Sequence, residues 1–156
     1  MSADPPDGFR YHARCSWRGS TGVGWEAYGR AHEAEAPPAT AALTLTAAPE
    51  FGGDPTLLNP EQLLLLSAMS CQLLSFLAVA ARARVDVLEY DDDGEALMPE
   101  EPKPPRITNI TLRPRIVATG GTRERIEHLV EVAHRNCFIA NSVNSEISVE
   151  PTIEVR

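Results

Sequence analysis

The sequence predicts a single domain of the α+β class, in which antiparallel sheets pack around a long buried central helix and a second helix. The chain has 156 residues, enough for one domain with a hydrophobic core. The predicted order is three strands, a long helix, a hairpin and a strand, a second helix and a last strand, which is typical of this class. We expect one domain over residues 1–156, with residues 1–8 as a flexible N-terminal segment.

Alternating residues predict three strands in the N-terminal part of the chain. Phe9–Trp17 carries apolar or aromatic side chains at odd positions and polar ones at even positions. Gly19–Gly22 supplies turn residues, so Val23–His32 is expected to return as the second strand of a hairpin, with Arg30 on its polar face. Ala41–Ala48 alternates again and predicts the third strand.

The long helix is predicted from its start signal and its apolar composition. Asn59 is expected to cap it, and Pro60 stands at the first helical position, where its missing N–H costs nothing. The helix should run to about Arg84. Its apolar residues cover most of the circumference: Leu63, Leu64, Leu65, Leu66, Met69, Leu73, Leu74, Phe76, Leu77 and Val79. A small monomer cannot hide such a surface, so we expect a central helix that is also buried by a second subunit.

A hairpin and an exposed loop are expected after this helix. Val85–Tyr90 and Glu95–Met98 flank Asp91–Gly94, which is a hairpin signal of the Asp-Gly type. The acidic run in this turn is best explained as a solvated face. Pro99–Arg106 contains four prolines and predicts an exposed loop.

The C-terminal part predicts a strand, a helix and a last strand. Even positions from Thr108 to Ala118 are mostly apolar, and Thr122 can cap a helix after them. The apolar stripe of this helix consists of Ile126, Leu129, Val130 and Ala133. Cys137 stands at the end of that stripe and should therefore face the core. Ile147–Val155 alternates and predicts the last strand.

Charge and composition exclude several classes of partner. The chain has 22 acidic and 14 basic residues, a formal net charge of −8, which argues against binding to nucleic acid or to an anionic membrane. Polar residues interrupt Leu63–Ala81, so this segment is expected to fall short of a membrane span. We see no secretory signal and expect a cytoplasmic protein.

Three cysteines cannot all pair within one chain, which suits a reducing compartment. Cys71 lies midway along the predicted long helix. It is either a core thiol that packs as a small hydrophobic side chain, or one half of a redox pair with Cys137. Cys15 is expected on the inward face of the first strand and is not expected to be required.

The start of the long helix and the two later cysteines resemble the OsmC/Ohr family of thiol-dependent hydroperoxide reductases. The run Asn59-Pro60-Glu61-Gln62-Leu63 is followed by Cys71, ten residues after Glu61, and the run Ala133–Cys137 ends in the second cysteine. The resemblance covers nearly the whole chain and implies an OsmC-like intertwined homodimer. Phe138 follows the second cysteine where many relatives have proline, and Gln72 stands where many have an aromatic residue or histidine. These departures indicate a divergent branch.

The resemblance also implies roles for four residues. Cys71 would attack the peroxide and become a sulfenate, and Cys137 would resolve it as a disulfide. An arginine of the N-terminal sheet, which we assign to Arg30, would hold the thiolate and be oriented by Glu61. Arg10, Arg14 and Arg18 are the alternatives for this arginine, and each is better explained as part of a solvated strand face. The cycle would need an external thiol or dithiol as reductant, and neither a metal nor an organic cofactor.

Helix geometry supports a shared site. Ten helical residues rise about 15 Å, so Glu61 and Cys71 of one straight helix cannot touch. Antiparallel pairing of two such helices across a two-fold axis would bring Glu61 of one subunit toward Cys71 of the other. An apolar lining is expected around Leu65, Met69, Leu73 and Phe138, and it favours organic hydroperoxides as substrates.

Two other functions are open. A metal site could be formed by His128, His134, Cys137 and Cys71, although a tetrahedral site needs further ligands at recognisable spacing. The chain could instead be a non-catalytic dimer of the same fold that binds a hydrophobic ligand or a protein partner. Thiol reactivity separates these interpretations, because a structural thiol is inert to peroxide.

Overall fold

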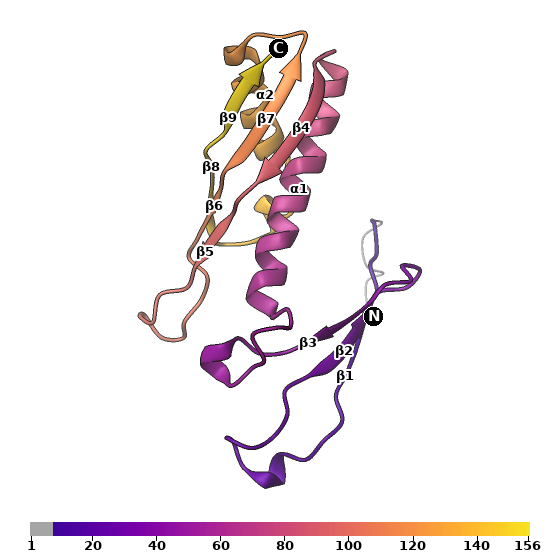
Figure 1. The fold of residues 1–156 in the computed structure, drawn as a ribbon, viewed down its shortest axis with the longest axis vertical. Coiled ribbons are helices and arrows are strands. Elements are labelled where there is room, and N and C mark those ends of the chain that lie inside the picture. Colours follow the sequence, from indigo (N-terminus) through magenta and orange to yellow (C-terminus); the bar gives the residue numbers. More distant parts are fainter. Residues whose placement is uncertain (1–7) are drawn as a thin grey trace, which may run out of the picture. The chain divides into compact units, whose positions relative to one another are not determined.

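The computed structural model describes residues 8–156 and divides the chain into two compact units, Met1–Pro60 and Glu61–Arg156 (Figure 1). The predicted flexible segment 1–8 lies outside the described residues, apart from Gly8. The predicted α+β class is confirmed. The prediction of a single domain over residues 1–156 stays a prediction.

The first unit contains one antiparallel sheet of order β1-β2-β3. Its strands are β1 (Arg14–Ser16), β2 (His32–Glu35) and β3 (Ala42–Leu45), and its short 3₁₀ helices are η1 (Thr21–Val23) and η2 (Pro49–Phe51). All three residues of β1 are exposed, so the prediction that Cys15 faces inward is wrong.

The predicted return strand Val23–His32 is also wrong, because β2 begins at His32 and residues 17–31 form a loop. The loop is ordered by its aromatic side chains. Trp17 packs edge-on against Tyr28, and its indole Nε1 donates to the carbonyl of Gly29 at 2.8 Å. Trp25 also packs edge-on against Tyr28. These contacts override the alternating pattern, and Arg30 therefore lies in a loop rather than on a strand.

The second unit combines two helices with six strand segments. Its elements are α1 (Pro60–Arg82, which begins at the last residue of the first unit), β4 (Asp86–Asp92), β5 (Glu95–Leu97), β6 (Asn109–Leu112), β7 (Pro114–Thr119), α2 (Arg123–Arg135), η3 (Ala140–Ser142), β8 (Glu146–Val149) and β9 (Thr152–Val155). The strand segments follow one another in three consecutive pairs: β4 and β5, β6 and β7, and β8 and β9. The sheet orders are β4-β7-β9 and β5-β6-β8.

The Asp91–Gly94 hairpin is a wrong prediction. β4 pairs with β7, and β5 pairs with β6. Because β6 and β7 follow one another in the chain, β4 and β5 lie one after the other along this continuous segment and do not pair with each other. Asp92 lies opposite Pro114 and Glu95 opposite Thr111, which keeps one register across the break. The true turn of this long hairpin is the proline-rich loop between β5 and β6. The acidic run ends β4 and leads into the short break before β5.

The last strand pairs in parallel, whereas antiparallel sheets were predicted. β8 runs parallel to β6, and β9 runs parallel to β7. The cause is the connection: α2 crosses over between β7 and β8, and a crossover helix returns the chain in the same direction. Thr122 caps α2 as predicted, accepting from the N–H of Arg125 at 3.2 Å.

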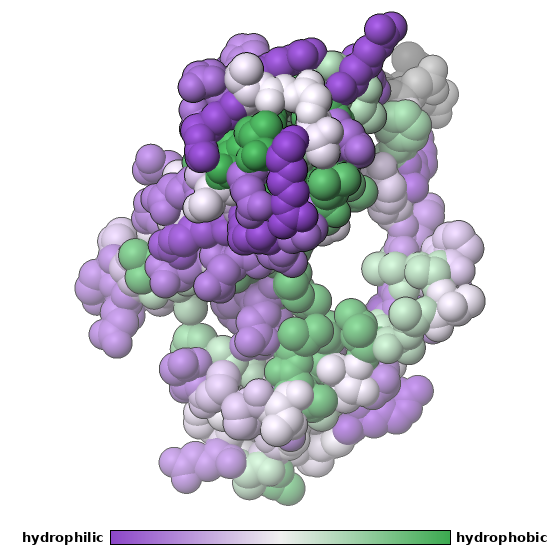
Figure 2. Space-filling view, turned by 45° about the horizontal axis from the view of Figure 1, so that its top comes forward, coloured by the Kyte–Doolittle hydropathy of each residue, from purple (hydrophilic) through white to green (hydrophobic). Residues whose placement is uncertain are grey.

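The main core lies between the two helices and one face of the β4-β7-β9 sheet (Figure 1). α1 contributes Phe76 and Ala80, and α2 contributes the predicted stripe, in which Ile126 and Ala133 are fully buried. The opposite face of the sheet carries ion pairs, in which Arg115 contacts Glu89 at 2.7 Å. Figure 2, with the C-terminal end of this unit turned forward, shows hydrophilic side chains with apolar ones between them.

α1 buries only one stripe within the described chain: Ala68, Gln72, Phe76 and Ala80. By length and composition it could cross a membrane, with a mean hydropathy of 2.1, so the expectation that Leu63–Ala81 falls short is wrong by this measure. The core helix of a soluble protein meets the same criterion. Gln72 is 1% exposed and donates to the carbonyl of Val130 in α2 at 3.3 Å, as expected of a helix packed inside a protein.

Asp92→Asn is expected to stabilise the protein at neutral pH. One carboxylate oxygen of Asp92 accepts from the N–H of Arg113 at 2.8 Å, and the other is buried without a partner among the described residues. Burial is the main cause that raises the pKa of Asp92. Asparagine keeps the acceptor and removes the charge. Because the site is partly exposed, we expect a gain of about 0.5 kcal/mol in urea unfolding at pH 7.

The pH dependence checks the cause of that gain. A raised pKa in the folded state means that the charged carboxylate costs stability once the pH rises above the unfolded value, and costs nothing below it. The difference between wild type and Asp92→Asn should therefore vanish below the ordinary pKa of aspartate. If the two proteins differed in stability by the same amount at pH 7 and below the ordinary pKa of aspartate, the charge of Asp92 would not be the cause of the gain.

Candidate active site

The structure brings Cys71 and Cys137 together. Cys71 lies on α1 and is partly exposed, whereas Cys137 follows the end of α2 and is 2% exposed. The thiol of Cys137 donates a hydrogen bond to the sulfur of Cys71. Cys137 stands just beyond the helix rather than on it, at the end of the core-facing stripe as predicted.

Hydrogen bonds favour the thiolate of Cys71. Burial is the largest single influence and opposes ionisation, but the donors around the sulfur outweigh it and lower the pKa of Cys71. These donors are the backbone N–H of Ile139, the thiol of Cys137, the backbone N–H of Phe138 and the hydroxyl of Ser75. Cys71 is therefore the thiol that ionises first, and the thiolate is the nucleophilic form.

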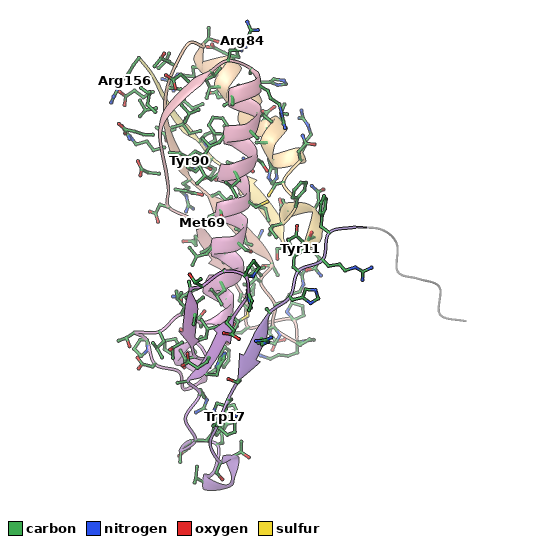
Figure 3. The ribbon with its side chains drawn as sticks, turned by 90° about the vertical axis from the view of Figure 1, so that its right-hand side faces the viewer. Tyr11, Trp17, Met69, Arg84, Tyr90 and Arg156 are labelled. Atoms are coloured by element: carbon green, nitrogen blue, oxygen red, sulfur yellow. The ribbon has the colours of Figure 1, made fainter. Side chains whose placement is uncertain are left out.

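The second thiol has the opposite tendency. Burial raises the pKa of Cys137, and its hydrogen bond to Cys71 and the charge of that residue raise it further. Tyr90 of β4, labelled in Figure 3, packs its ring against that of Phe76 with 5.8 Å between the ring centroids. Burial raises the pKa of Tyr90, with smaller contributions from Asp92 and Cys137. The thiol of Cys137 is therefore harder to ionise than that of Cys71.

Arg30 lies in the first unit, where aromatic rings and carbonyl groups hold its guanidinium. The carbon Cζ is 4.1 Å from the ring centroid of Tyr28 and 4.8 Å from that of Trp25. The nitrogens Nη1 and Nη2 donate to the carbonyls of Tyr28 at 3.0 Å and Trp25 at 2.7 Å. Gly52 has a positive φ of 78°, and a Cβ there would lie 3.0 Å from Cζ of Arg30. The loop is therefore shaped around this guanidinium.

Arg30 also lines an aromatic pocket of about 360 Å³ in the first unit. Trp17, Trp25, Tyr28 and Phe51 contribute the rings. The pocket gives this unit a concave apolar surface with one cation at its wall.

Glu61 lies in the first turn of α1, and one of its carboxylate oxygens is buried without a partner among the described residues. The helix is continuous from Pro60 to Arg82, so Glu61 and Cys71 are about 15 Å apart along it. The predicted pairing of Glu61 with the thiolate site cannot therefore form within one helix. The roles of Arg30 and Glu61 stay predictions.

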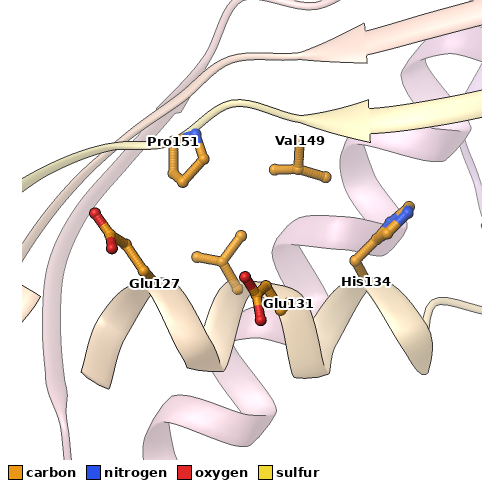
Figure 4. Close-up of a pocket in the computed structure, with 6 residues that line it drawn as sticks. Glu127, Glu131, His134, Val149 and Pro151 are labelled. Atoms are coloured by element: carbon orange, nitrogen blue, oxygen red, sulfur yellow. The ribbon is translucent and has the colours of Figure 1, made fainter. Parts of the chain in front are cut away.

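His134 faces a different pocket. With Glu127 and Glu131 of α2 it lines an open pocket of about 290 Å³, and Val149 and Pro151 line the side across from the helix (Figure 4). Among residues 8–156, no group of three or more His, Cys, Asp or Glu side chains is close enough to hold a metal ion. The described residues thus offer no support for the metal-site alternative.

The expected apolar lining is only partly in place. Leu65 and Met69 pack against the second core cluster of the unit, around Ala68, rather than lining open space. Phe138 is 81% exposed next to the two thiols. An exposed apolar side chain therefore directly follows Cys137.

Comparison with known proteins identifies the family to which this fold belongs. The family model described as OsmC-like protein matches residues 52–152. The chain belongs to the OsmC-like protein family. None of the curated proteins matches the chain in sequence.

Solved structures agree with this family. An OsmC-like protein of unknown function from Vibrio cholerae is 27% identical, with a TM-score of 0.83 over 93% of this chain and 100% of that chain. Organic hydroperoxide resistance proteins from Legionella pneumophila and Elizabethkingia anophelis are 20% and 16% identical, with TM-scores of 0.65 and 0.69. Each covers 96% of this chain and 99% of its own, and both show a likeness of fold.

The hydrogen-bond donors around Cys71 are not among the site residues predicted from the sequence. Ser75 stands one helical turn after Cys71, so its spacing could have revealed it. The N–H groups of Phe138 and Ile139 have no side-chain signature. Proline, which many relatives carry at the position of Phe138, has no N–H to donate.

Proposed function

We propose that this protein is a thiol-dependent hydroperoxide reductase that acts on organic hydroperoxides through Cys71. The observation that carries the proposal is the contact between two free thiols whose pKa values are shifted in opposite directions. The pKa of Cys71 is lowered and that of Cys137 is raised. A reactive and a resolving thiol need this difference, because one must be ionised while the other keeps its proton.

The reaction proceeds in two balanced steps. The Cys71 thiolate attacks the outer oxygen of the hydroperoxide, the O–O bond breaks, and the alkoxide takes up a proton and leaves as an alcohol. Cys71 is then a sulfenic acid. The sulfur of Cys137 attacks that of Cys71, and its proton leaves with the hydroxide as water. The resulting disulfide is reduced by an external thiol or dithiol, so the cycle uses no metal or organic cofactor and suits a reducing compartment such as the cytoplasm.

The resemblance to the family supports two further parts of this proposal. Arg30 holds the thiolate and the peroxide oxygens, and Glu61 of the partner subunit orients the guanidinium. A homodimer is supported by the apolar face that α1 leaves exposed, on which Leu66, Leu74 and Leu77 are between 39% and 63% exposed. The hydroperoxide resistance proteins of similar fold support the choice of substrate.

Consumption of an organic hydroperoxide by the purified protein with a small dithiol tests the function. We expect turnover, and a Cys71–Cys137 disulfide after peroxide is added without reductant. Hydrogen peroxide provides the comparison, because equal turnover would count against a preference for organic substrates. No consumption, together with thiols that do not react with peroxide, would favour a non-catalytic binding dimer instead.

A further inference from the structure

We propose that Asn141 is a positioning residue for Cys71: it holds the turn Cys137–Ser142 so that the backbone N–H groups of Phe138 and Ile139 donate to the Cys71 sulfur. The inference rests on the proposed function, in which Cys71 is the attacking thiol. It assigns part of the activation of this thiol to neutral donors within its own unit.

The hydrogen bonds of the turn leave these donors free for the sulfur. The N–H of Asn141 donates to the carbonyl of Cys137 at 3.1 Å, and the N–H of Ser142 donates to that of Ile139 at 2.9 Å. The carbonyls of the turn thus accept within it. The N–H groups of Phe138 and Ile139 donate to Cys71, and that of Ile139 also reaches Cys137. The same turn therefore binds both sulfurs.

The side chain of Asn141 fastens this turn to the end of α2. Its Nδ2 donates to the carbonyl of Arg135 at 3.0 Å and to that of Cys137 at 2.9 Å. The hydroxyl of Ser142 adds a bond to the carbonyl of Phe138 at 2.6 Å. Because Asn141 bridges the helix and the turn, its loss should let the N–H groups move away from the sulfur.

The surroundings leave few other causes for the behaviour of Cys71. Ser75, on its own helix, contributes a neutral hydroxyl, and the turn after α2 contributes the thiol of Cys137. From β4, Tyr90 faces Cys137, and Asp92 faces Tyr90. Fixed N–H donors stabilise an anion without a counterion, so the proposed activation does not depend on a second subunit.

The test follows alkylation of Cys71 by iodoacetamide between about pH 5 and pH 10 in the reduced full-length protein, with mass spectrometry reporting the modified cysteine. Asn141→Ala is compared with Asn136→Ala. Asn136 is the control because its side chain donates to the carbonyl of Val132 at 2.8 Å, near the end of the same helix, and makes no such bond to the turn Cys137–Ser142. We expect the pH midpoint of Cys71 alkylation to be higher in Asn141→Ala than in Asn136→Ala. Equal midpoints would overturn the proposal.

A second pair removes one donor directly. Ile139 has a φ of −69°, which proline can adopt. Ile139→Pro and Ile139→Ala lose the same side-chain packing, but only proline loses the N–H. We expect the midpoint of Ile139→Pro to lie about one pH unit above that of Ile139→Ala, a tenfold loss of thiolate at lower pH. Coinciding midpoints would contradict the role of this N–H, and if Ile139→Pro does not fold, the asparagine pair decides.

No peroxide enters this titration, so its result is separate from the proposed function. Shifted midpoints support the positioning role even if the protein consumes no hydroperoxide. Turnover by the wild type with unshifted midpoints would leave the proposed function standing and remove the inference.

Discussion

Cys71→Ser is expected to lower the turnover of an organic hydroperoxide by at least about 10³-fold, because the hydroxyl of serine is not ionised at neutral pH and cannot attack the O–O bond. The substitution changes one atom on a helix whose buried stripe it does not join, so the fold should persist. The measurement is peroxide consumption with a small dithiol, alongside the circular dichroism and melting temperature of both proteins.

The other two cysteines provide matched controls. Cys15 is exposed in the first unit, and Cys15→Ser should leave turnover unchanged. Cys137→Ser should still consume about one equivalent of peroxide per Cys71, leaving a sulfenic acid that dimedone traps, because it lacks the resolving thiol. If Cys71→Ser retained the activity of the wild type, the assignment of the attacking thiol would be wrong.

The parts of the fold that rest on local signals were predictable. α2 begins after Thr122 and buries Ile126 and Ala133 because its cap and its helical period both lie within one short segment. The wrong predictions fall where distant contacts decide. Asp91–Gly94 has a local turn signal, but pairing with β6 and β7 extends the chain through it.

The predicted return strand of the first unit is wrong for a similar reason. An alternating pattern predicted a strand through Arg30, yet the rings of Trp25 and Tyr28 enclose its guanidinium and keep the segment in a loop. In the site, the resemblance carried by the spacing of Cys71 from Glu61 predicts Cys71 as the attacking thiol, and this role stays a prediction. The apolar stripe correctly placed Cys137 in the core. The backbone donors of Phe138 and Ile139 could not be predicted, because a backbone N–H is present in every residue except proline.

If the protein is the proposed homodimer, Leu74→Asp is expected to convert it to a monomer. Leu74 is 63% exposed in the described chain, on the face of α1 opposite its buried stripe. Burying one leucine contributes about 1.5–3 kcal/mol, and a two-fold axis makes each contact occur twice. A buried unpaired carboxylate on each copy adds to the loss, so we expect the dissociation constant to rise by at least about 100-fold. Sedimentation equilibrium measures the change.

Leu88→Asp is the control, because Leu88 is 49% exposed on β4 of the same unit and should not affect assembly. In the proposed shared site the monomer should also lose turnover, since a straight α1 holds its own Glu61 about 15 Å from Cys71 and only a second copy can bring Glu61 to the thiol site. Its Cys71 should still be alkylated readily, because the N–H donors of Phe138 and Ile139 belong to the same unit. A wild-type protein that sediments as a monomer and still turns over peroxide would exclude the shared site.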